Sequence, residues 1–173
     1  KINTAAGEQR APAYLKVNPR GRVPTLVVDG KVLVENVAIL TWVAGGHPQA
    51  GLWPKTTWEQ AQAVSMMAWF ADTVHPAFAH VFRAERYVPE GAPSDDVKAK
   101  GREAYWDCLK EIDRLVAGRR WTMGRQFTAV DGYIIVFCRW ANRIGLPVKE
   151  LANLSALVER ILARAEEMVE DES

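Results

Sequence analysis

The chain begins with a short strand-like pattern and continues with a long helix-like one. Val23–Val28 is a β-rich run, and Asp29–Gly30 is the strongest two-residue hairpin signal. Residues 31–34 supply the returning strand. Two antiparallel strands alone are only marginally stable, so they need more strands or a helix packed against them. Residues 35–43 predict that helix, and Gly45–Gly46 is expected to end it.

From residue 57 onward, apolar residues recur at helical spacing. One long helix is expected to begin at Thr57 and to kink at Pro76, because proline removes a backbone donor and clashes with the preceding turn. A second helix carries apolar residues three or four positions apart between Val97 and Leu115. The run 133–138 is apolar almost all round, which predicts a buried central helix. A final amphipathic helix includes Leu154.

These patterns predict an α+β chain with two domains. Residues 1–46 form a small α/β domain, and residues 57–173 form an all-helical domain. Residues 47–56 contain two prolines and a glycine, which is typical of a linker.

Composition narrows the function classes. The 173 residues are 49% hydrophobic, which is enough for a substantial core. The net charge of +1 predicts no basic field for nucleic acid or anionic membranes. No uncharged apolar run reaches about 18 residues, so no membrane span is expected. Cys108 and Cys138 lie within helical patterns and are expected to be free, inert thiols, which together with the absence of a signal-peptide pattern predicts a cytoplasmic protein.

Two motifs carry a family resemblance. Residues 18–39 resemble the pattern N-P-x-G-x-V-P-x-L, D-G, L-x-E-S-x-A-I of cytosolic glutathione S-transferases. Residues 121–131 resemble the family segment W-x-x-G-x-x-F-[ST]-x-A-D. The motifs follow the family's order and rough spacing, and the resemblance covers essentially the whole chain. Within the family, the chain looks most similar to the bacterial beta class.

The resemblance implies an incomplete thioredoxin-like domain, lacking its first strand–helix–strand unit, followed by a helical bundle. It implies a homodimeric enzyme that conjugates glutathione thiolate to small hydrophobic electrophiles, with glutathione as co-substrate and no metal. A free thiol has a pKa of about 8.5, so the family stabilises the thiolate with a Tyr, Ser or Cys. The resemblance places that residue before Lys1, and we expect the intact protein to contain this upstream segment.

Four residues are expected at the peptide and γ-glutamyl parts of a glutathione site. In the family, the peptide bond matching Val23–Pro24 is cis and offers its backbone to the glutathione peptide. A trans proline at the start of a strand is the alternative. Glu35 is expected to face the γ-glutamyl ammonium, and Asn36, where the family has Ser, its carboxylate. Both could instead be simple helix-start residues.

Three further residues are weaker candidates. Arg22 either pairs with the glycine carboxylate or is a surface arginine. The resemblance places His75 beside the glutathione sulfur as an accessory group and Asp72 nearby, on the same helix face. A structural or exposed histidine is the alternative. Two departures from the family weaken this part of the site, because Ala68 replaces a binding Asn and Pro76 replaces a frequent Lys.

Other functions remain open on the same fold. A glutathione-dependent peroxidase, isomerase or dehalogenase would use the same site. A non-catalytic binding or interaction module is a second possibility, favoured by Asn36 and Ala68 and opposed by the matches at Val23–Pro24 and Glu35. Thr128–Asp131 has the form of a capping box, and we assign it to stability rather than to chemistry.

Overall fold

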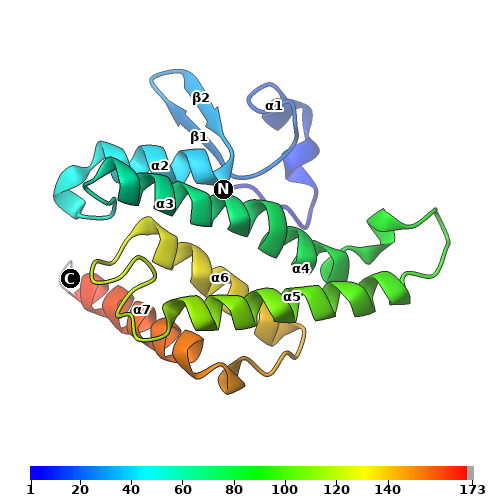
Figure 1. Cartoon of the computed structure of the whole chain (residues 1–173). Helices are drawn as coiled ribbons and strands as arrows, with labels where there is room; N and C mark the ends of the chain where they lie inside the picture. Colours follow the sequence, from blue (N-terminus) through cyan, green and yellow to red (C-terminus); the bar gives the residue numbers. More distant parts are fainter. Residues whose placement is uncertain (171–173) are drawn as a thin grey trace.

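The computed structural model describes the backbone of residues 1–170 and the side chains of residues 1–167 (Figure 1). Its first part contains a 3₁₀ turn (Glu8–Arg10), α1 (Pro12–Leu15), β1 (Thr25–Val28), β2 (Lys31–Val34) and α2 (Asn36–Gly46). The strands form an antiparallel hairpin in which Thr25 lies opposite Val34. Asp29 and Gly30 both adopt left-handed backbone angles, as the predicted two-residue turn requires.

Helix α2 ends at the predicted Gly45–Gly46 pair. The helix continues through Gly45 and Gly46, and its C-cap is His47. Neither glycine adopts a positive φ, so neither uses the freedom with which glycine usually terminates a helix. The chain then passes through a 3₁₀ turn (Pro48–Ala50) within the predicted linker.

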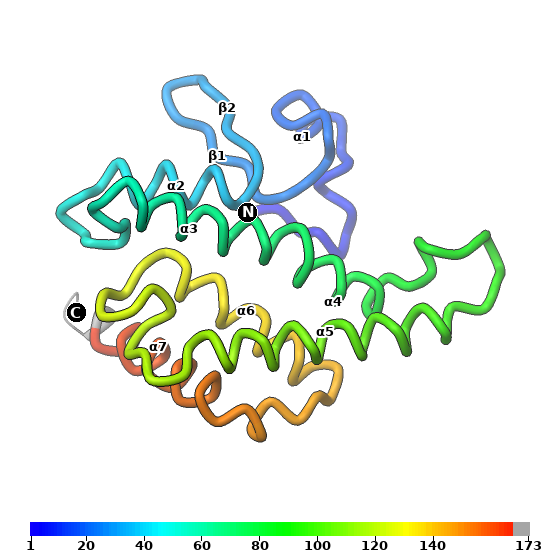
Figure 2. The backbone as a smooth tube through the Cα atoms, in the orientation of Figure 1, coloured from blue at the N-terminus to red at the C-terminus, as the bar shows by residue number. Residues whose placement is uncertain are grey.

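The rest of the described chain is helical. It contains α3 (Thr57–Trp69), a π-helical turn (Phe70–Val74), α4 (His75–Phe82), α5 (Asp95–Val116), α6 (Ala129–Arg143) and α7 (Ala152–Glu170), with 3₁₀ turns at Ala84–Tyr87 and Val148–Glu150. Helix α4 packs against α5, and α7 packs against α5 and α6 (Figure 2). Helix α2 lies against α3 and α6, and in the view of Figure 1 the hairpin rises above α2 and α3.

The break expected at Pro76 takes the form of the π-helical turn. Pro76 has no N–H with which to continue the i→i−4 ladder. The helix widens just before the proline, and His75 donates its N–H to the carbonyl of Phe70, five residues earlier. Such turns within α-helices are rare and are often found at functional sites.

One hydrophobic core joins the elements. Phe70, Tyr105 and Phe137 are its largest fully buried side chains. The prediction that residues 133–138 form a central helix is confirmed, because α6 buries most of this run. Helix α2 contributes Val37 and Leu40 to the same core. The division into domains at residues 1–46 and 57–173 stays a prediction, and residues 171–173 lie outside the described part.

The described chain has neither a membrane-spanning helix nor a cluster of metal-ligating side chains. No described helix combines the length and apolar character needed to cross a bilayer. Nor does any group of three His, Cys, Asp or Glu side chains in this part of the molecule lie close enough to hold a metal ion.

Candidate functional site

The loop before β1 presents an open backbone edge. The Val23–Pro24 peptide bond is cis, which confirms that prediction. The side chain of Val23 is 45% exposed. Its backbone N–H and C=O form no hydrogen bond with any described residue. An extended peptide could therefore pair with them as an added strand.

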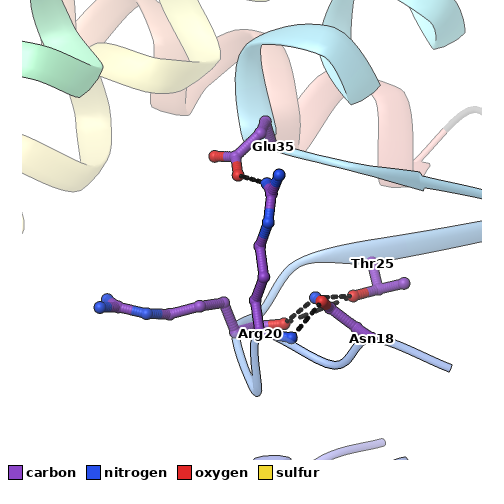
Figure 3. Close-up of polar contacts among 5 residues, drawn as sticks. Asn18, Arg20, Thr25 and Glu35 are labelled. Atoms are coloured by element: carbon purple, nitrogen blue, oxygen red, sulfur yellow. Dashed lines mark hydrogen bonds and ion pairs between the residues drawn. The ribbon is translucent and has the colours of Figure 1, made fainter. Parts of the chain in front are cut away.

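Buried polar contacts hold this loop in place. Asn18 is only 2% exposed, and its Nδ2 donates to the Arg22 carbonyl at 2.8 Å and to Thr25 Oγ1 at 3.0 Å (Figure 3). The Tyr14 hydroxyl donates to the same Arg22 carbonyl at 2.6 Å and lies 2.7 Å from Thr25 Oγ1. These contacts fix the backbone on which Val23 sits. They also give Tyr14 a structural role in the loop.

Glu35 occupies an unusual backbone conformation at the start of α2. Its φ is 72° and its ψ is 123°, a region that a residue with a Cβ rarely adopts. Such a conformation costs on the order of 1–3 kcal/mol and is found most often at functional sites. The adjacent Asn36 side chain forms no hydrogen bond with the described residues, and the first N–H groups of α2 are open. The Glu35 carboxylate, which is an acceptor, therefore lies beside several donors, the Asn36 amide and the first N–H groups of α2.

An ion pair joins this helix start to the loop. Arg20 Nη1 lies 2.6 Å from Glu35 Oε1, and Figure 3 shows the arginine reaching from the loop to the beginning of α2. Arg20 could not be singled out from the sequence, because the family pattern leaves its position variable. The remaining signal, a basic residue in a tight Asn-Pro-x-Gly loop, was too general to identify it.

His75 begins α4 at the end of the π-helical turn. Its ring meets Trp140 edge-on, with ring centroids 5.0 Å apart. Although part of the ring is exposed, its partial burial lowers the pKa of His75, and the nearby positive charges of Arg83 and Arg22 lower it further. The imidazole is therefore mainly neutral at pH 7. Arg22, on the loop before β1, therefore acts on His75 through its charge.

Asp72 stands apart from these contacts. It lies within the π-helical turn, its side chain is exposed, and it forms no hydrogen bond or ion pair with any described residue. The structure therefore brings Val23, Arg20 and Glu35 together through the loop. The charge of Arg22, on the same loop, lowers the pKa of His75. Asp72 contacts none of these residues.

An aromatic stack continues from His75 along α4. Phe78 stacks on Trp140 with ring centroids 4.6 Å apart and on Phe82 at 5.6 Å. Phe82 remains exposed, and the Arg143 guanidinium lies 4.5 Å from its ring centroid. Phe78 at the middle of the stack is buried, Trp140 is half-buried, and only Phe82 at the outer end is exposed.

The two cysteines and Asp131 serve the core rather than the site. Both thiols are free and buried. Burial raises the pKa of Cys138 to about 12, and burial followed by the charges of Glu111 and Asp107 raises the pKa of Cys108. Both thiols are therefore poor nucleophiles. Asp131 is fully buried and accepts hydrogen bonds at the start of α6.

Known proteins resemble this chain along most of its length. Residues 1–45 match the family model described as the glutathione S-transferase N-terminal domain. Glutathione S-transferase GST-4.5 of Xanthomonas campestris pv. campestris is 34% identical over 166 residues, covering 93% of this chain and 79% of the relative.

Solved structures of glutathione transferases also resemble this chain. A glutathione transferase homolog from Sulfitobacter, determined with bound glutathione, superposes with a TM-score of 0.87 at 31% identity, covering 99% of this chain and 83% of the other. The beta-class glutathione S-transferase of Sphingomonas chungbukensis gives a TM-score of 0.78 at 30% identity, covering 88% of this chain and 73% of the other. These likenesses confirm the predicted fold class, with thioredoxin-like elements followed by a helical bundle. The chain belongs to the glutathione S-transferase family.

Proposed function

We propose that this protein is a cytoplasmic enzyme that conjugates the thiolate of glutathione to small hydrophobic electrophiles. The observation that carries the proposal is the open backbone of Val23, which precedes β1 where Thr25 pairs with Val34, the residue before Glu35 and the start of α2. Glutathione has an extended peptide middle and a zwitterionic γ-glutamyl end. The Val23 backbone can pair with the peptide middle, and Glu35 and Asn36 can bind the γ-glutamyl ammonium and carboxylate.

The cationic residues beside the loop support binding of the other end of glutathione. Arg22 is exposed, and among the described residues only its backbone carbonyl is engaged, by Tyr14, Asn18 and Thr25. Its guanidinium is therefore free to pair with the glycine carboxylate. Asp72, exposed in the π-helical turn, is a weaker candidate for a contact with the same ligand.

The chemistry requires a glutathione thiolate near neutral pH. A free thiol is mostly protonated at pH 7, so a donor to the sulfur must stabilise its anion. We propose that His75 borders the sulfur as an accessory group, because its lowered pKa keeps the imidazole neutral. A neutral imidazole can donate one hydrogen bond without carrying a full charge. We assign the main thiol-activating role to none of the described residues, since Tyr14 is engaged in the loop and both cysteines are buried.

The aromatic stack is our candidate for the electrophile side of the site. It begins at Trp140 beside His75 and extends through Phe78 to the exposed ring of Phe82. An apolar acceptor molecule held there would lie next to the thiolate, and holding two reactants together lowers the barrier to their reaction.

A binding measurement and an activity measurement test the proposal together. Isothermal titration calorimetry measures glutathione binding, and absorbance follows conjugation of glutathione to an activated aryl chloride. We expect saturable binding and turnover above the uncatalysed rate. Binding without turnover of any electrophile would favour a non-catalytic binding module, and absence of binding would exclude the enzyme and leave a protein-interaction module. Turnover of a peroxide or a cis–trans isomerisable acid, instead of the aryl chloride, would identify a related glutathione-dependent enzyme.

We also propose that the protein forms a homodimer through the face of α3. A groove between α3 and the end of α5 is lined by apolar side chains that include Met66, Trp69 and Leu115. Trp58 stands at this groove and is 73% exposed, which is unusual for so large an apolar side chain. Light scattering coupled to size exclusion should give twice the chain mass. Trp58→Asp should shift the protein toward monomer, and a wild-type protein that runs as a monomer would contradict the proposal.

A further inference from the structure

We propose that Arg20 is an additional binding residue of the glutathione site, and that the Arg20–Glu35 ion pair recognises the zwitterionic end of the γ-glutamyl group. This inference rests on the proposed function and deepens it. The ammonium would bind Glu35, and the α-carboxylate on the same carbon would bind Arg20.

The geometry of the pair leaves room for a ligand. A single contact joins Arg20 Nη1 to Glu35 Oε1 at 2.6 Å. Arg20 Nη2 and Glu35 Oε2 form no hydrogen bond with any other described side chain or backbone group. The pair therefore offers one free donor and one free acceptor side by side. An α-amino acid carries its ammonium and its carboxylate on one carbon, which matches this arrangement.

Both partners are held in place by their backbones. The Arg20 backbone N–H donates to Asn18 Oδ1 at 3.1 Å, and Asn18 is buried (Figure 3). Glu35 is held by its left-handed φ at the start of α2. The two side chains thus meet from two anchored segments that are fifteen residues apart in the sequence. Little backbone rearrangement is needed before a ligand binds, which favours affinity.

The exposure of the pair indicates that it serves a ligand rather than the fold. The side chains of Arg20 and Glu35 are 64% and 69% exposed. Exposed ion pairs contribute little to folding stability because water screens them. Yet Glu35 adopts an unfavourable backbone conformation in the position where it meets Arg20. The small contribution of an exposed ion pair to folding stability therefore does not explain why the strained conformation of Glu35 is retained.

Arg20 would also compensate for the residue that departs from the family pattern. Asn36 stands where the family resemblance implies a serine that faces the γ-glutamyl carboxylate. A guanidinium can supply two donors to a carboxylate, and charge-assisted hydrogen bonds are stronger than neutral ones. Arg20 would therefore restore recognition of the same carboxylate from the loop side.

The test combines variants with modified ligands. Calorimetry would measure binding of glutathione, of an analogue without the α-carboxylate, and of an analogue without the α-amino group. Arg20→Gln should weaken glutathione binding about tenfold, the loss of roughly one charge-assisted hydrogen bond. The same variant should bind the analogue without the α-carboxylate as well as the wild type does. Glu35→Gln should show the opposite selectivity, losing affinity for ligands that retain the ammonium.

Controls separate a contact from a general charge effect. Lys31→Gln removes an exposed positive charge from the hairpin and should leave all three affinities unchanged. Arg20→Gln should leave the thermal midpoint near that of the wild type, whereas a structural role would lower it. Equal weakening for all three ligands, or unchanged glutathione affinity, would overturn the role of Arg20 while leaving the proposed function intact. A wild-type protein that binds no glutathione would overturn both.

Discussion

The Tyr14 hydroxyl and the Arg22 main-chain carbonyl are 2.6 Å apart, and this contact ties α1 to the loop that carries Val23. Asn18 Nδ2 donates to the same carbonyl at 2.8 Å. The shape of the candidate site therefore depends on side chains that do not face a ligand.

The first prediction concerns this support. Asn18→Ala removes three hydrogen bonds from a buried amide and should destabilise the protein by about 2–3 kcal/mol. Tyr14→Phe removes only the hydroxyl and should cost about 1 kcal/mol. Both should weaken glutathione binding because the Val23 backbone loses its fixed position. Urea unfolding and calorimetry measure the two effects.

A surface asparagine provides the control for this pair. Asn142 is exposed, and its side chain forms no hydrogen bond with the described residues. Asn142→Ala should change both stability and affinity within error. If Asn18→Ala behaved in the same way, the loop would not depend on the buried amide.

Two glycines should respond in opposite directions to the same change. A Cβ at Gly101 would lie 2.7 Å from His80 Cβ and 3.0 Å from the backbone nitrogen of Val81, so α5 and α4 would have to separate. Gly101→Ala should destabilise by about 1–3 kcal/mol. A Cβ at Gly132 in α6 would meet nothing within 4 Å. Gly132→Ala should stabilise by up to about 1 kcal/mol, because alanine favours the helix.

Thermal or urea unfolding measures the change in stability of both variants, and each glycine variant serves as the control for the other. A stabilised Gly101→Ala variant would show that the helices can separate without cost. A destabilised Gly132→Ala variant would show that α6 is more crowded than its structure indicates.

Asp131 should prove essential for folding. Its carboxylate accepts the backbone N–H of Thr122 at 2.7 Å and that of Thr128 at 2.8 Å, and all of it is buried. Asp131→Ala leaves both donors unsatisfied and should cost about 3 kcal/mol or more. Asp107→Ala, which removes an exposed ion pair with Lys110, should cost less than about 1 kcal/mol. Equal losses in urea unfolding would contradict the capping role.

The lowered pKa of His75 predicts a pH effect with a definite sign. Because the folded protein holds this pKa below the ordinary value of 6.5, the unfolded chain binds the proton more readily. The contribution of His75 to stability is therefore complete above pH 6.5 and is lost as the pH falls from there toward its folded pKa. NMR titration of the His75 ring should give a midpoint below 6.5.

Neighbouring arginines test the cause of that shift. Arg83→Gln should raise the midpoint of His75, because it removes a nearby positive charge. Arg86→Gln removes a charge that does not act on His75 and should leave the midpoint unchanged. A midpoint unaffected by Arg83→Gln would leave burial of the ring and the charge of Arg22 as the causes of the shift.

The sequence predicted the parts of the site that local patterns encode. The hairpin turn at Asp29–Gly30 and the helix start after Glu35 follow from short-range signals. The cis bond at Val23–Pro24 came from the family resemblance. These features depend on residues that are close together along the chain.

Contacts between distant segments could not be predicted in the same way. The Arg20–Glu35 ion pair depends on how the loop before β1 packs against the start of α2. The pattern of apolar and polar residues along the chain does not indicate this packing. The influence of Arg22 on His75 requires the packing of α4 relative to the hairpin. Pro76 predicted a break in the helix, yet the sequence alone did not indicate that a π-helical turn would accommodate it. The placement of Asp72 and His75 on one face assumed a regular helix and stays untested.

The conformation of Glu35 has a consequence for anyone who engineers this protein. Glycine accepts a positive φ without steric conflict, so Glu35→Gly would relieve local strain in the backbone. A directed-evolution campaign that selected only for heat resistance would therefore tend to enrich this substitution and discard the carboxylate. Thermostable survivors with an intact hairpin and no affinity for glutathione would be the expected product, unless the screen also demanded ligand capture.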